Sequence, residues 1–207
     1  MDEGNPKEIV DLYKKLLVHI EDGGEGAEDE NSQEELSPEE QEKRAMETGG
    51  LTGGLPKNPN TLEYGEGHAS IVYVATMDAA GNVTSSIEKG TEFSIRMRVK
   101  FNKDVSEPIF AYTFKNLQGT EITGTNTMFE GIPVGPRKAG DDIVITFRQK
   151  MDLQGGEYLL SMSCTSFVNG DLVAHDRLYD VLNITVVSDK NTVGFYDMNS
   201  KVKIDKL

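Results

Sequence analysis

The chain has 207 residues, with one cysteine, three histidines, no tryptophan and a formal net charge of −14. This length allows one sizeable domain plus appendages, and a single cysteine excludes a disulfide framework or a Cys-rich metal site. The negative charge disfavours nucleic acid or anionic lipid as the main partner, because both require an attractive field.

The first predicted element is an amphipathic helix at residues 6–21, which we delimit as an N-terminal segment at 1–21. Asn5 can cap this helix, and Pro6 suits its first position. The apolar side chains that share one helical face are Ile9, Leu12, Tyr13, Leu16, Leu17 and Ile20. A single apolar stripe needs a partner surface, which the main domain, a second copy of the chain or an upstream domain can supply.

Residues 22–60 are predicted to form an acidic linker that contains Gly and Pro. Twelve acidic and two basic residues fall within residues 21–48, a net charge of −10, as is typical of a solvated segment. Within the linker, Ser37 followed by Pro38 predicts a short helix at 38–46. The Gly and Pro residues after it favour flexible coil.

The remainder, residues 61–207, is predicted to be a β domain, because apolar and polar residues alternate along it. The predicted strands cover residues 70–77, 91–101, 108–115, 142–149, 157–166, 180–188 and 193–198. Turn signals separate them, and Asn169-Gly170 is typical of a type I′ hairpin. Short strands without intervening helices predict an antiparallel β-sandwich, and the long irregular stretch at 127–141 favours a Greek-key crossover over an up-and-down barrel.

Motifs for catalysis, metals or membrane insertion are sparse. Without a P-loop or an HExxH spacing, neither a nucleotide cofactor nor zinc is expected. His175-Asp176 with Asp180 can be drawn as a metal or acid/base cluster, but neighbours on a strand point to opposite faces, so polar residues at the start of a strand are the simpler interpretation. Cys164 falls on an apolar strand face and is expected to be a buried small hydrophobe. No apolar stretch approaches the ~18 residues of a membrane span and no signal peptide opens the chain, so we expect a cytoplasmic protein.

Basic and aromatic side chains on the sheet faces are the candidates for binding. Arg96 and Arg98 project from the polar face of one predicted strand, and Arg148 projects from another. These charges either keep a solvated sheet face soluble or hydrogen-bond a neutral or acidic polymer. Tyr112 and Tyr179 can offer rings for stacking, or can lie at the edge of the core.

A series of motifs runs along the β domain in a defined order. They are SIRMRVKF (94–101), PIFAYTFKNLQGTEITGTNT (108–127), GDDIVITF (140–147), LQGGEYLLS (153–161) and HDRLYDVLNITV (175–186). Over residues 64–206 the series resembles the C-terminal domain of Wzt-type ATP-binding subunits of ABC exporters for polysaccharides such as O-antigen or teichoic-acid-like polymers. The helix at 6–21 resembles the tail that follows the nucleotide-binding domain in such subunits.

The resemblance implies an immunoglobulin-like or jelly-roll sandwich that recognises the export substrate without catalysis, often at a modified non-reducing end. The implied partners are a polysaccharide, the parent ATP-binding domain and a membrane permease, at the inner face of the cell membrane. The candidate carbohydrate-binding residues are Arg96, Arg98, Tyr112, Asn126, Arg148 and Tyr179. Asn126 lies in the stretch FKNLQGTEITGTNT, predicted to be a hairpin around Gly119 whose Thr and Asn side chains satisfy backbone groups.

The resemblance also implies a homodimer, often formed by exchange of the last strand. Residues 192–204 fit such a strand, with Val193, Phe195 and Tyr196 as candidate contacts, although an ordinary edge strand fits equally well. Two other hypotheses stay open. In the first, the domain is a dimerisation module without a ligand. In the second, it is a glycan-modifying enzyme, which requires a carboxylate pair or a metal in a cleft.

Overall fold

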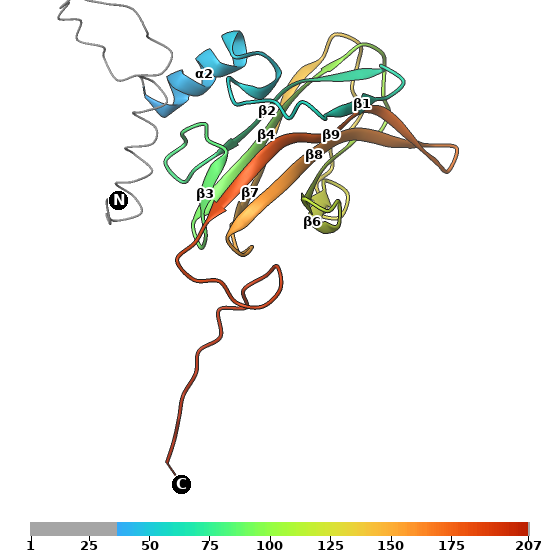
Figure 1. Cartoon of the computed structure of the whole chain (residues 1–207). Coiled ribbons are helices and arrows are strands. Elements are labelled where there is room, and N and C mark those ends of the chain that lie inside the picture. The colour runs from blue at the N-terminus through green and yellow to red at the C-terminus, as the bar shows by residue number, and fades with distance from the viewer. Residues whose placement is uncertain (1–36, 207) are drawn as a thin grey trace, which may run out of the picture. The chain divides into compact units, whose positions relative to one another are not determined.

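The computed structural model describes residues 37–206, which form two packed β-sheets and a short helix (Figure 1). The elements are α2 (Pro38–Thr48), the 3-10 helix η1 (Gly50–Thr52), β1 (Leu62–Tyr64), β2 (Ala69–Met77), β3 (Ser86–Glu88), β4 (Glu92–Phe101), β5 (Ile109–Asn116), β6 (Glu121–Asn126), β7 (Asp142–Lys150), β8 (Gly156–Val168) and β9 (Asp171–Val187). The predicted helix at 6–21 lies outside the described residues.

The larger sheet has the order β1-β9-β8-β5-β6, with β3 parallel to β9, and the smaller sheet has the order β2-β4-β7. All the other strand pairs are antiparallel. The stretch 127–141 carries the chain from β6 in one sheet to β7 in the other, as a sandwich crossover requires. The predicted all-β antiparallel sandwich is confirmed.

Alternation along β4 and β5 places the core between the sheets. The side chains of β4 that face the core are Phe93, Ile95, Met97, Val99 and Phe101. Opposite them on β5 lie Phe110, Tyr112 and Phe114, and the rings of Phe101 and Phe110 meet edge to face at 6.5 Å. Burying each such ring contributes roughly 1.5–3 kcal/mol to folding, so this alternation determines which faces meet.

The C-terminal strands differ from the prediction. The strand predicted at 180–188 is the second half of β9, because the Asn169-Gly170 turn, with φ of 54° and 92°, joins β9 directly to β8. Asp180 also has a positive φ of 56° beside a shift in the β8–β9 register, and this bulge breaks the alternation that the prediction used. Residues 193–198 form no strand, and one isolated bridge joins Tyr196 to Leu153.

The short helix predicted after Ser37 is confirmed as α2. The Ser37 hydroxyl accepts a hydrogen bond from the backbone N–H of Glu40, whose carboxylate accepts one from the N–H of Ser37, a reciprocal capping box. The Gly-rich residues after α2 pack on the sandwich and do not form the flexible coil that their composition favoured. Gly53, with φ of 61°, lies so close to the Tyr73 ring that a Cβ would come within 2.8 Å of it. The absence of a side chain at Gly53 therefore allows the backbone to approach the Tyr73 ring closely.

Candidate functional site

The predicted arginines lie together on the outer face of the smaller sheet, and two of them are already paired. Arg98 on β4 binds Asp142 on β7 through two hydrogen bonds, Nε to Oδ1 at 2.8 Å and Nη2 to Oδ2 at 2.7 Å. The hydrogen bond from Arg98 holds the pKa of Asp142 below its ordinary value. Arg148, one strand away from Arg96 on the same face, is exposed.

Helix α2 covers the β2 side of this face and pairs with Arg96. Glu42, only 6% exposed, accepts a hydrogen bond from Arg96 Nη1. Tyr73 is buried beside this pair, and burial, assisted by the charge of Glu42, raises its pKa to about 12. A cleft of about 710 Å³ next to α2 exposes Arg96 and Arg148, but its acidic lining residues are Glu39, Glu42, Asp78 and Glu92. This lining disfavours an anionic polymer.

Tyr179 lies on the outer face of the larger sheet, whereas the three arginines lie on the smaller sheet. Its ring packs on Tyr64 at 5.8 Å between centroids, with the Lys115 ammonium 4.4 Å and the Arg177 guanidinium 5.1 Å from its centroid. Lys115 is in turn paired with Asp180 at 3.2 Å. The Tyr179 ring is therefore engaged within the chain.

Asn126 ends β6 and holds the start of the crossover. Its side-chain oxygen accepts the backbone N–H of Phe129 at 2.7 Å, and the neighbouring Thr127 hydroxyl accepts that of Phe110 at 3.2 Å. The prediction that this Thr/Asn stretch satisfies backbone groups is confirmed. A direct ligand contact from Asn126 stays a prediction.

Tyr112 lines a cleft of about 580 Å³ at one edge of the sandwich. The cleft walls come from the edge strands β6 and β7, which belong to different sheets. Tyr112 meets the rings of Phe114 at 5.7 Å and Phe147 at 5.1 Å, both edge to face, and Phe93 adds a further ring to the lining. Burial, with the negative charge of Glu130, raises the pKa of Tyr112, so its hydroxyl stays neutral at physiological pH.

Polar side chains accompany the rings. They are Thr120, Glu121, Thr123, Gln149, Lys150 and Asp152. The amide nitrogen of Gln149 is buried without a hydrogen-bond partner in the part of the chain that the structure describes. The cleft thus combines apolar rings with a few hydrogen-bonding groups, as small-ligand sites do.

The third wall is the C-terminal strap, which we define as residues 188–199. Phe195 and Tyr196, which are 45% and 57% exposed, line the cleft, whereas Val193 is 98% exposed and lies outside its lining. The structure thus joins Tyr112, predicted for sugar binding, to Phe195 and Tyr196, predicted for dimerisation. Whether these strap residues contact a second copy stays a prediction.

Sequence reasoning missed several residues of this site. Alternation indicated Phe93 and Phe114 as core residues, and that is correct, but no sequence signal shows that the sandwich edge beside them is open. Gln149 looked like any polar strand residue. Lys89 and Asp197, which hold the strap, lie 108 positions apart, so no local pattern links them.

His175 and Asp176, considered above as part of a metal or acid/base cluster, have a structural role. Both side chains are buried inside β9, at 2% and 7% exposed, so the interpretation as polar residues at a strand start is wrong. His175 Nε2 lies 2.8 Å from the Ser166 hydroxyl, and Asp176 accepts the Ile71 N–H at 2.6 Å, which ties β2 to β9. Burial lowers the pKa of His175 and raises that of Asp176.

Among residues 37–206, no group of three or more His, Cys, Asp and Glu side chains is arranged to hold a metal ion. Cys164 is fully buried, as predicted, and burial raises the pKa of its thiol to about 12. A thiol with so high a pKa is no nucleophile at neutral pH. Over the same residues, no helix is both long and apolar enough to cross a bilayer.

Comparison with known proteins points to one family. The family described as the Wzt C-terminal domain matches residues 60–198, which include both the cleft and most of the strap. No curated protein sequence matches the chain.

One solved structure, described as the crystal structure of the C-terminal domain of wzt, superposes with a TM-score of 0.68. It is 24% identical, and the match covers 73% of this chain and 92% of that one. The CARDB domain of PF1109 from Pyrococcus furiosus matches at 11% identity over 58% of this chain and 94% of that one, but its TM-score of 0.32 carries no structural argument.

Proposed function

Because the chain belongs to the Wzt C-terminal domain family, we propose that it is a non-catalytic domain that recognises a polysaccharide for export by an ABC transporter. Its partners would be the ATP-binding domain of the parent subunit and the membrane permease, at the cytoplasmic face of the membrane. The observation that carries the proposal on this chain is the aromatic cleft at the sandwich edge.

The chemistry of the cleft suits a sugar. The C–H-rich face of a pyranose packs on aromatic rings, which Tyr112, Phe195 and Tyr196 supply from two walls. The hydroxyls at the sugar rim need donors and acceptors, and Gln149 and Asp152 offer them. A volume of about 580 Å³ lies within the range of small-ligand sites. It suits a short end of a polymer better than a long internal stretch.

The binding test uses the polysaccharide isolated from the surface of the organism that encodes the chain, cleaved to short oligosaccharides. Calorimetric titration of the full chain should show binding, and Tyr196→Ala should weaken it by at least about tenfold, as expected for an aromatic hot spot. The matched control is Tyr64→Ala, which removes a ring of similar exposure, 44%, from the outer face of the larger sheet. Absence of wild-type binding would refute glycan recognition, and a larger loss in Tyr64→Ala would place the site on that face.

A second candidate function, dimerisation without a ligand, is favoured by the end of the chain. Beyond the strap the chain leaves the sandwich (Figure 1), and Val202 and Ile204 are 85% and 91% exposed. Exposed alternating apolar residues are suited to pairing with a second copy, by strand exchange or at an edge. Sedimentation equilibrium of the full chain and of a chain ending at Asn199 tests this. A dimer that the truncation dissociates supports the candidate, and a full-length monomer contradicts it.

A further inference from the structure

The C-terminal strap has little apolar contact to keep it in place. Its backbone meets the segment after β7 through two hydrogen bonds, Gln154 N to Phe195 O at 2.9 Å and Asp197 N to Asp152 O at 3.0 Å. Its apolar side chains, Val193, Phe195, Tyr196 and Met198, are between 45% and 98% exposed. So short a ladder with so little burial is weak by itself.

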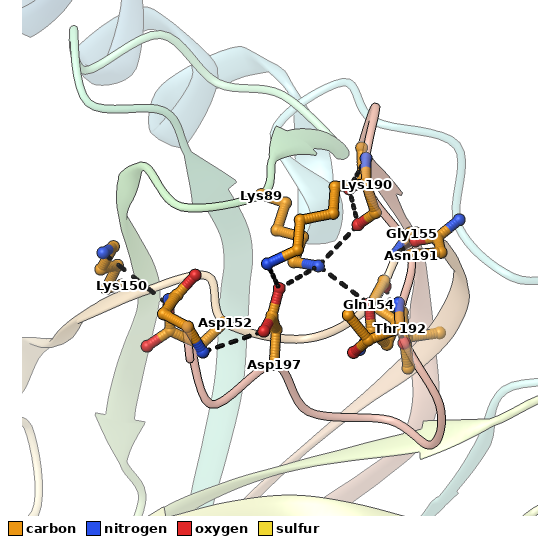
Figure 2. Close-up of polar contacts among 12 residues, drawn as sticks. Lys89, Lys150, Asp152, Gln154, Gly155, Lys190, Asn191, Thr192 and Asp197 are labelled. Atoms are coloured by element: carbon orange, nitrogen blue, oxygen red, sulfur yellow. Dashed lines mark hydrogen bonds and ion pairs between the residues drawn. The ribbon is translucent and has the colours of Figure 1, made fainter. Parts of the chain in front are cut away.

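A buried charge cluster supplies the missing attachment (Figure 2). Asp197 is 4% exposed, and its carboxylate lies 2.9 Å from the Lys89 ammonium and 3.0 Å from that of Lys190. Lys89, just beyond β3, also donates to the Gln154 side chain at 2.8 Å and to the Lys190 carbonyl at 2.7 Å. Among these residues Lys89 alone lies between β3 and β4, so it ties the strap to a second segment of the sandwich beside residues 152–155.

The neighbouring contacts converge on the same point. Gln154 accepts the Thr192 N–H at 3.1 Å, and Asn191 accepts the Gly155 N–H at 2.8 Å (Figure 2). Gly194 and Asn199, with φ of 85° and 52°, bracket the aromatic residues and Asp197. The strap is therefore a short element held by a charge cluster and by hydrogen bonds to residues 152–155, with left-handed residues on either side of its aromatic part.

We propose that Asp197 and Lys89 position the Phe195–Tyr196 wall of the cleft, so that the strap acts as a latched lid over the bound glycan end. This inference rests on the proposed function. Neither residue lines the cleft, so both act through the strap and not by touching the ligand. Latching would restrict the rings to one place before binding, and such preorganisation raises affinity. A released strap would leave Tyr112 and the cleft floor in place but remove the opposite rings.

The first experiment reports on the strap without a ligand. The chain has no tryptophan, so Tyr196→Trp introduces a unique fluorophore on the strap. Acrylamide should quench it about twice as strongly when Asp197→Asn or Lys89→Met is added, because the released ring is more accessible. The matched control is Asp104→Asn, which removes the charge from an exposed ion pair with Lys138, and it should leave quenching unchanged. Equal quenching in all variants would refute the latch.

The second experiment measures affinity for the same oligosaccharides in chains that keep the native Tyr196. Asp197→Asn should weaken binding at least about fivefold, equivalent to about 1 kcal/mol, while Asp197→Glu should restore part of the loss. A strap that is released without any loss of affinity would overturn the lid. If the wild type binds no oligosaccharide, the proposed function fails, while the quenching experiment still decides whether the latch exists.

Discussion

The charged face of the smaller sheet and the aromatic cleft at the sandwich edge differ in what their side chains already bind. On the charged face, Arg96 and Arg98 are each paired with a carboxylate of the same chain, although Arg96 Nε has no hydrogen-bond partner among residues 37–206. In the cleft, by contrast, the strap rings of Phe195 and Tyr196 are about half exposed. Charged side chains on a sheet face thus pair with counter-charges of the same chain, whereas aromatic rings on separate segments keep an exposed face that a ligand or another chain can cover.

The largest expected effect is a loss of stability from a mutation in the cleft floor, because the residues that form the floor also belong to the hydrophobic core. Phe114 is 2% exposed and packs on Phe93 and Tyr112. Phe114→Ala should lower the free energy of unfolding by about 3–5 kcal/mol, because it leaves a cavity. Urea denaturation measures this. Phe129→Ala, at a 76% exposed ring, is the control and should change it by less than about 0.5 kcal/mol. A similar loss of stability in both variants would contradict the assignment of Phe114 to the core.

The next effect concerns the buried ion pair between Glu42 of α2 and Arg96 of β4. Glu42→Gln should lower the free energy of unfolding by about 2 kcal/mol, because Arg96 then keeps its charge without its partner. Glu47→Gln on the exposed side of the same helix is the control, with an expected change within about 0.5 kcal/mol. Thermal denaturation compares the two. If Glu42→Gln behaves like its control, α2 does not depend on this pair.

A smaller effect is expected for the exposed pair on the same face. Arg98→Gln should cost at most about 1 kcal/mol at neutral pH, because solvent screens the pair. Arg98 lowers the folded-state pKa of Asp142, so the stabilisation is present above the ordinary value of 3.8 and is lost as pH falls through the folded pKa. Urea denaturation over a pH series should therefore show the wild-type and variant curves converging in acid. A gap that widens in acid would reverse the sign.

The smallest effect is expected at Arg148. Because this exposed residue lies outside the aromatic cleft, Arg148→Gln should change oligosaccharide affinity by less than about twofold and leave stability unchanged. Calorimetric titration beside Tyr196→Ala gives the comparison. A tenfold loss at Arg148 would move the binding site to the charged face and remove the distinction between the two regions.

Much of the fold could be predicted because burial on one strand face follows the alternation of apolar residues. The long strands β2, β4, β5, β7 and β8 lie within one or two residues of their predicted bounds. The three-residue strands β1 and β3 carry too few positions for a period to show. The site was harder to predict, because Arg96, Tyr112 and Tyr179 lie on three different surfaces that a strand pattern alone cannot tell apart.

Four features could be predicted from the sequence alone: the all-β sandwich, the cap of α2, the Asn169-Gly170 hairpin and the family. These depend on local spacing, turn chemistry and motif order, which the chain carries without reference to its fold. The three-dimensional structure was needed to learn which arginines are paired, that Gly53 after η1 packs on Tyr73, and that Tyr112 shares a cleft with Phe195 and Tyr196. Those outcomes depend on contacts between residues dozens of positions apart, which sheet topology and the Asp197 latch bring together.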